Sequence, residues 1–114
     1  SNLLELSLTE ITLSEQSLKQ LANSTEALRS VKNLTLKSIA GMTDSILTDT
    51  LRSVGESLET LDVSYNHELS DSCLSAIRQY NTRLRSLSMN AVKELTSAGL
   101  LALFLHPLEG LPPP

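Results

Sequence analysis

One spacing of leucine-like residues, L-x-x-L-x-L, occurs four times and restricts the fold of this chain more than any other feature. The four copies begin at Leu3, Val31, Leu58 and Leu84, so their starts are 28, 27 and 26 residues apart. Internal repeats with a period of about 20 to 50 residues are typical of architectures in which similar units stack, because one unit cannot bury its apolar face alone. The sequence therefore predicts a stack of four similar units.

Within each unit the spacing of the apolar residues changes. In the third copy Leu61 and Val63 alternate with Asp62 and Ser64, which predicts a short strand. Each copy then has a hydroxyl residue suited to a helix N-cap and a leucine four residues later; the caps are Ser14, Thr43, Ser70 and Thr96, and the leucines are Leu18, Leu47, Leu74 and Leu100. An acidic residue follows three of the caps, where the helix dipole favours a negative charge: Glu15, Asp44 and Asp71. Each unit is thus expected to form a strand, a loop and a helix.

These units predict an α/β fold, a leucine-rich-repeat solenoid of right-handed strand-loop-helix repeats. The parallel sheet is expected on the concave face and the helices on the convex face. We interpret residues 1–114 as a single fragment with repeats at 3–30, 31–57, 58–83 and 84–108 and a Pro-rich end at 107–114. Ser1-Asn2 and the terminal prolines suggest a piece of a longer protein.

Composition argues against several functional classes. The net charge of −4 disfavours direct nucleic-acid binding, which normally needs a basic surface. We therefore expect the chain to contact DNA only indirectly, through a partner protein. A single cysteine, Cys73, cannot form an intramolecular disulfide, which favours an intracellular location. No apolar run approaches the roughly 18 residues of a membrane span, so no membrane association is expected.

Residues with catalytic chemistry are sparse. His67 and His106 lie far apart without a nearby cysteine or a suitably spaced carboxylate, which argues against a metal site. Cys73 falls in the first turn of the third expected helix, where a packed thiol is the simpler interpretation, and no glycine has the spacing of a phosphate-binding loop. We therefore expect no enzyme activity, no cofactor, no metal and no small-molecule substrate.

A partner-binding surface is the remaining kind of site, and repeat proteins usually bind through the concave sheet. The outward positions there are mostly short and polar, and Tyr65 and His67 follow the third strand as more suitable anchors. The candidate partner-binding residues are Lys37, Asp62, Ser64, Tyr65, His67 and Asn90. A merely solvated sheet, with Tyr65 covering the end of the core, is the alternative. We attribute the position of the arginines at 78, 83 and 85 to the favourable interaction of cations with helix C-termini rather than to a phosphate contact.

The unit resembles the cysteine-containing class of leucine-rich repeats known from F-box proteins, although Ile11, Ile39, Asn66 and Val92 stand where that class has cysteine. Asn66 matches the asparagine of other repeat classes, whose side-chain amide bonds the backbone of the next turn. The segments LTLKSIAGMTD, LDVSYNHELSD and LSMNAVKELTSAGLLALF, followed by LEGLPPP, resemble the fungal leucine-rich-repeat subunit of global-genome nucleotide excision repair.

This resemblance implies a nuclear, non-enzymatic scaffold in DNA-damage recognition. Its implied partners are a Swi2/Snf2-type ATPase and an elongin-C/cullin ubiquitin ligase. We therefore expect a protein-protein interaction scaffold of a nucleotide-excision-repair and ubiquitin-ligase complex. The alternative is the substrate-receptor repeat domain of an F-box ubiquitin ligase.

Overall fold

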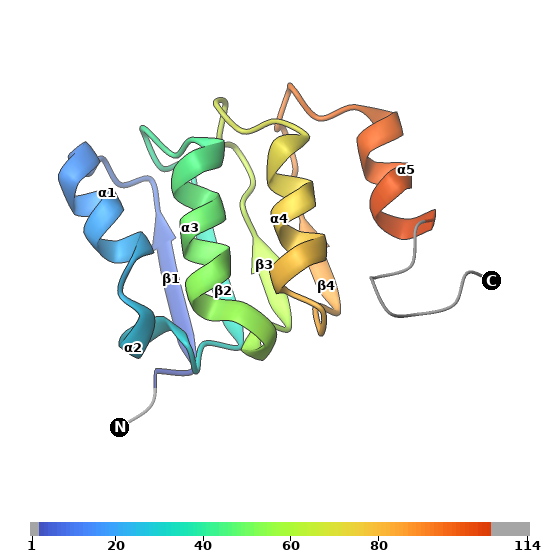
Figure 1. Cartoon of the computed structure of the whole chain (residues 1–114). Coiled ribbons are helices and arrows are strands. Elements are labelled where there is room, and N and C mark those ends of the chain that lie inside the picture. Colours follow the sequence, from blue (N-terminus) through green and yellow to red (C-terminus); the bar gives the residue numbers. More distant parts are fainter. Residues whose placement is uncertain (1–2, 106–114) are drawn as a thin grey trace.

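Strands and helices alternate along the chain, and a computed structural model describes residues 3–105 of it (Figure 1). The elements are β1 (Glu5–Thr9), α1 (Glu15–Ala22), α2 (Thr25–Leu28), β2 (Asn33–Lys37), α3 (Asp44–Val54), the 3-10 helix η1 (Gly55–Ser57), β3 (Thr60–Asp62), α4 (Ser72–Tyr80), β4 (Ser86–Ser88) and α5 (Ser97–Leu105). The expected Pro-rich end at 107–114 and His106 lie outside the described residues.

The strands form one parallel sheet with the order β1-β2-β3-β4. The second leucine of each L-x-x-L-x-L copy occupies the same position across the sheet, because Leu6 pairs with Leu34, Leu34 with Leu61, and Leu61 with Leu87. The α/β class and the parallel pairing of the four predicted strands are confirmed.

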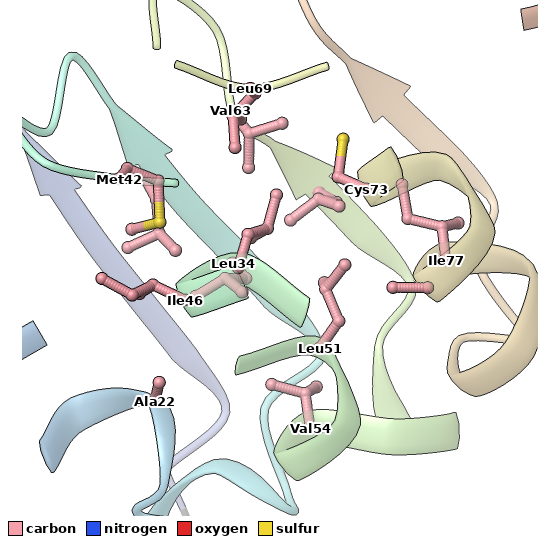
Figure 2. Close-up of a cluster of buried hydrophobic side chains, with 14 of the residues drawn as sticks. Ala22, Leu34, Met42, Ile46, Leu51, Val54, Val63, Leu69, Cys73 and Ile77 are labelled. Carbon is pink, nitrogen blue, oxygen red and sulfur yellow. The ribbon is translucent and has the colours of Figure 1, made fainter. Parts of the chain in front are cut away.

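Helices α1, α3, α4 and α5 lie on one face of the sheet (Figure 1). The core lies between the two layers and consists almost entirely of aliphatic side chains, including Leu34, Leu51, Val63 and Leu69 (Figure 2). Each fully buried aliphatic side chain contributes roughly 1.5 to 3 kcal/mol, so the central strands are the best-stabilised part of the molecule.

Three helices begin as the hydroxyl residues predict. Ser14 accepts from Ser17 N at 3.1 Å, Thr43 caps α3, and α5 starts directly after Thr96, whose hydroxyl accepts from Gly99 N at 2.9 Å. The prediction for Ser70 is wrong by one residue, because the N-cap position of α4 is Asp71. Ser70 directly precedes this position; its hydroxyl donates to Asp44 of the preceding unit and accepts from Ser72 N at 3.3 Å.

Of the acidic residues after the predicted caps, Glu15 and Asp44 lie in the first helical turn as predicted, whereas Asp71 is itself the N-cap residue of α4. The Asp44 carboxylate accepts hydrogen bonds from Ser70 N at 2.9 Å and Ser70 Oγ at 2.6 Å. In the same way the Asp71 carboxylate accepts from Thr96 N at 2.9 Å and Thr96 Oγ1 at 2.5 Å. We call these two arrangements the carboxylate clamps. Asp44 and Asp71 therefore join consecutive units, whereas Glu15 forms an ion pair with Lys19 on its own helix.

A left-handed residue ends the strand segment of every unit. The φ angles are +56° at Glu10, +53° at Ser38, +63° at Tyr65 and +56° at Ala91. None of these residues is glycine or asparagine, the types that adopt this conformation most readily, so the sequence carries no local signal for it. The turn repeats at the same spacing as the leucine pattern.

Candidate partner-binding surface

The face of the sheet opposite the helices is covered by no helix in the described part of the chain (Figure 1). Its side chains come from alternate strand positions and are short and polar. Lys37 on β2 and Asp62 on β3 meet there, with Nζ and Oδ2 3.9 Å apart. Because both side chains remain partly exposed, this ion pair contributes at most about 1 kcal/mol, and both groups remain available to a partner.

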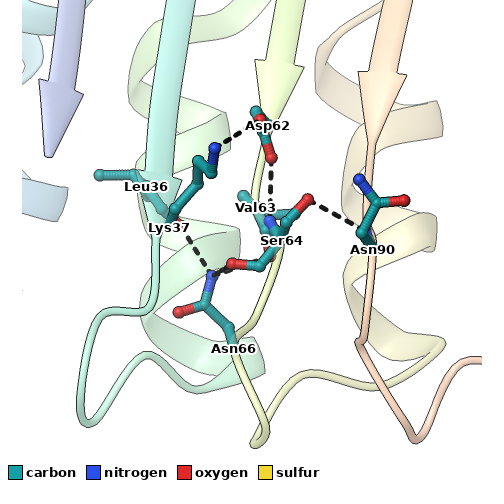
Figure 3. A network of polar contacts seen from close by, with 7 residues as sticks. All are labelled: Leu36, Lys37, Asp62, Val63, Ser64, Asn66 and Asn90. Atoms are coloured by element: carbon teal, nitrogen blue, oxygen red, sulfur yellow. Dashed lines mark hydrogen bonds and ion pairs between the residues drawn. The ribbon is translucent and has the colours of Figure 1, made fainter. Parts of the chain in front are cut away.

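A chain of hydrogen bonds continues from Asp62 toward β4 (Figure 3). Asp62 Oδ1 accepts from Ser64 N at 3.0 Å, and Ser64 Oγ accepts from Asn90 N at 3.0 Å. Ser64 is fully buried, so the prediction that it offers its hydroxyl to a partner is wrong. Its role is to hold the backbone of Asn90, whose own side chain remains exposed.

Asn66 determines how the loop after β3 is held (Figure 3). Its side chain is 2% exposed; Oδ1 accepts from Ile39 N at 2.8 Å, and Nδ2 donates to Leu36 O at 2.7 Å and Val63 O at 2.8 Å. The bonds to Ile39 and Leu36 join the third unit to the second, and the bond to Val63 lies within the third unit. The Asn66 amide does bond backbone groups, as the sequence resemblance suggested, but they belong to the preceding unit and to its own unit and not to the next turn. The role is structural because the side chain is inaccessible.

Tyr65 and His67 flank this buried asparagine and are themselves exposed. Tyr65 is 47% exposed, and its left-handed backbone is fixed by its N–H, which donates to Asn90 O at 2.8 Å. Both side chains line a shallow depression of about 250 Å³, together with the loop 38–42 and Glu68. A phenol, an imidazole and a carboxylate beside an apolar loop can accept a mixed polar and apolar side chain of a protein partner.

The structure thus brings Lys37, Asp62 and Asn90 to the open sheet face and Tyr65 and His67 to the adjoining strand-end loop. Sequence reasoning did not identify the loop 38–42 that completes the depression. The signal for it was Gly41, which adopts φ +84° between Ala40 and Met42.

The thiol of Cys73 lies inside the described part of the chain and is inaccessible. Cys73 is fully buried, and desolvation together with the nearby Asp44 carboxylate raises the pKa of its thiol to about 12. Within residues 3–105 no cluster of three His, Cys, Asp or Glu side chains is placed to hold a metal ion. Over the same residues no helix combines the length and apolar character of a membrane span.

The chain was compared with models of protein families, with curated proteins and with solved structures, and none of them matches it.

Proposed function

We propose that the chain is an arc of leucine-rich repeats that acts as a non-enzymatic scaffold for protein-protein interaction. Two periodic features support the repeat assignment. The paired leucines on the four strands and the left-handed residues at 10, 38, 65 and 91 recur at the same intervals. Such recurrence is expected of units that are copies of one another.

The open sheet face and the adjoining loop are the proposed contact surface. The observation that carries this assignment is the exposed Tyr65, held in a strained left-handed turn beside a depression of about 250 Å³. Tyrosine is enriched among the residues that dominate interface energies, and a rigid backbone lowers the entropy lost on binding. Lys37, Asp62 and Asn90 are the polar groups that would surround this anchor.

By the sequence resemblance, the proposed partners are a Swi2/Snf2-type ATPase and an elongin-C/cullin ubiquitin ligase. The chain would then belong to a nuclear complex for DNA-damage recognition in nucleotide excision repair, contacting DNA only through its partners. The substrate-receptor domain of an F-box ubiquitin ligase is the alternative assignment and would use the same surface.

The test is a pull-down of a purified Swi2/Snf2-type ATPase and of elongin-C by the immobilised chain. The double variant Tyr65→Ala/His67→Ala is expected to weaken retention at least about tenfold, as for the loss of an interface anchor. The matched control is Glu56→Ala/Gln79→Ala, two exposed positions away from the open sheet face. Retention of neither protein by the unmodified chain would contradict the proposed partners, and equal retention by the two double variants would contradict the proposed surface.

A further inference from the structure

The loops that follow the four strands lie along one edge of the molecule, the upper edge in Figure 1. We call residues 10–15, 38–44, 63–71 and 89–96 the strand-end edge. Its carboxylates are those of Glu10, Glu15, Asp44, Glu68, Asp71 and Glu94, and its one lysine is Lys93. With histidine counted as neutral, these six carboxylates and one ammonium group carry a formal charge of −5, whereas the rest of the chain sums to +1. The negative excess of the chain therefore lies on this edge.

A groove in the strand-end edge crosses the loop at Gly41. One half is the depression of about 250 Å³ beside Tyr65 and His67, and the other half is a second depression of about 270 Å³. The apolar residues that line the second depression are Leu13, Leu18 and Ile46. Gly41 and Glu68 line both depressions, so the two are continuous, and we call them together the Gly41 groove.

Gly41 keeps the second depression open. Its φ of +84° is unfavourable for other residues, and a Cβ built at this position would lie 3.3 Å from Leu18 Cδ1. A side chain here would therefore project toward the apolar wall of the second depression. The glycine leaves the approach to that wall free.

The charged groups of the Gly41 groove favour a cationic ligand. Two carboxylates line the groove, and no described lysine or arginine does. Glu15 is already paired with Lys19, with Oε1 and Nζ 2.9 Å apart. Glu68 is exposed and forms no ion pair within residues 3–105. Because Glu68 borders both depressions, a cation that pairs with it brings its neighbouring atoms against the apolar wall.

The Gly41 groove lies inside the stack of units and not at its ends. Its lining residues fall between 13 and 68, in the first three of the four units. Consecutive units contact one another through the sheet and through the helix layer. A unit added before β1 or after α5 would therefore lengthen the strand-end edge and leave this groove uncovered.

We propose that the Gly41 groove binds a basic segment of the protein partner. A lysine or arginine of that segment pairs with Glu68, and an apolar side chain next to it packs in the depression beside Leu13. The stem of the basic side chain packs on the Tyr65 ring, whose face attracts a cation. An acidic segment is repelled by the charge of the edge, and a neutral one gains nothing from Glu68. The inference rests on the proposed protein-binding function and adds the chemistry of the partner segment.

Peptide binding to the full chain tests this chemistry. The probe is a fluorescein-labelled peptide in which arginine alternates with leucine. Three matched peptides replace its arginines by glutamine, its arginines by glutamate, or its leucines by alanine. Fluorescence anisotropy is measured at about 150 mM salt, which screens distant charges. The probe is expected to bind at least about tenfold more tightly than each of the other three peptides.

Substitution of Glu68 tests the position of the cation. Glu68→Lys is expected to weaken binding of the probe at least about tenfold, because it replaces the pairing carboxylate by a like charge. The matched control is Glu56→Lys, which makes the same change in net charge at an exposed position before β3, at the opposite end of the strands. The control is expected to change binding less than about twofold, since salt screens a distant charge. Far-UV circular dichroism checks the fold of both variants, and Glu68→Gln replaces Glu68→Lys should the latter fail to fold.

Several results would overturn the inference: no binding of the probe up to about 1 mM, equal binding of the glutamine or glutamate peptide, or equal binding by Glu68→Lys and the unmodified chain. Equal binding of the alanine peptide would also overturn it, because charge attraction alone would then suffice.

These outcomes are distinguishable from failure of the proposed function. Retention of a proposed partner equally by Glu68→Lys and by the unmodified chain would overturn the inference and leave the protein-binding function standing. Selective binding of the probe with neither partner retained would support the inference and contradict only the proposed partners.

Discussion

Replacement of Asn66 by alanine is expected to be among the most destabilising single changes at a polar position of this chain. The side chain is 2% exposed and makes three short hydrogen bonds, to Ile39 N, Leu36 O and Val63 O, at 2.7 to 2.8 Å. At about 1 kcal/mol for each bond, Asn66→Ala should lower the free energy of unfolding by about 3 kcal/mol. That is a large share of the roughly 5 to 15 kcal/mol that stabilises a typical domain.

Urea denaturation followed by far-UV circular dichroism measures this loss, since the chain has no tryptophan to serve as a fluorescence probe. The midpoint should fall while the slope of the free energy against urea concentration stays constant. Asn90→Ala is the matched control: Asn90 also follows a strand but has an exposed side chain, and its loss should cost less than about 0.5 kcal/mol.

Asn66→Asp separates the two halves of the amide. It retains an acceptor for Ile39 N but places a carboxylate against the carbonyls of Leu36 and Val63. At neutral pH it should therefore destabilise the chain at least as much as alanine does. A loss below about 1 kcal/mol for both Asn66 variants would refute the view that this amide joins the second and third units.

Further expectations concern the clamps, the turns and the thiol. Hydrogen bonds from Thr96 hold the pKa of the Asp71 carboxylate below its usual 3.8. The contribution of these bonds to folding stability is therefore complete above pH 3.8 and is lost as the pH falls through the lowered pKa. The urea midpoint of the unmodified chain should therefore decrease in acid, and in the Asp71→Asn variant this decrease should be smaller. Gly99→Ala should destabilise, because a Cβ would overlap the Asp71 carboxylate, but should stabilise an Asp71→Ala background through helix propensity; equal effects in both backgrounds would contradict the clamp. Ala91→Gly should raise the free energy of unfolding by up to about 1 kcal/mol, whereas Ala27→Gly in helix α2 should lower it. Cys73 should react with a thiol reagent only in urea concentrations that unfold the chain; fast reaction under native conditions would contradict its burial.

The leucine spacing predicted the sheet because hydrophobic periodicity reports directly which side chains are buried together. Leu34 and Leu61 are neighbours across the sheet, as their positions in consecutive copies indicate. Hydroxyl residues predicted the helix starts equally well where the cap is local, as at Ser14 and Thr43. These features depend on residues near one another in the sequence or on a spacing repeated along it.

Contacts between units were harder to predict, because their partners lie about 26 residues apart and no short motif encodes them. Asp44 lies in the first turn of α3, as predicted, but nothing near it in the sequence indicates that its carboxylate also binds Ser70 of the next unit. Ser64 followed the alternation of an outward strand residue, but the backbone of Asn90 covers its hydroxyl. In both cases a polar side chain satisfies a backbone group of a neighbouring unit, which local pattern reasoning cannot anticipate.

The same contacts between units place the candidate binding residues. Asn66 bonds the backbone of Val63 from inside the turn, while the N–H of Tyr65 donates to Asn90 O of the next unit, so the backbone that carries Tyr65 is held from both sides. An anchor positioned by backbone bonds loses little further entropy on binding. It follows that stability and binding are coupled at this turn. A substitution that removes the Asn66 hydrogen bonds should weaken the binding of a partner at Tyr65, even though Asn66 itself is buried and would not touch that partner.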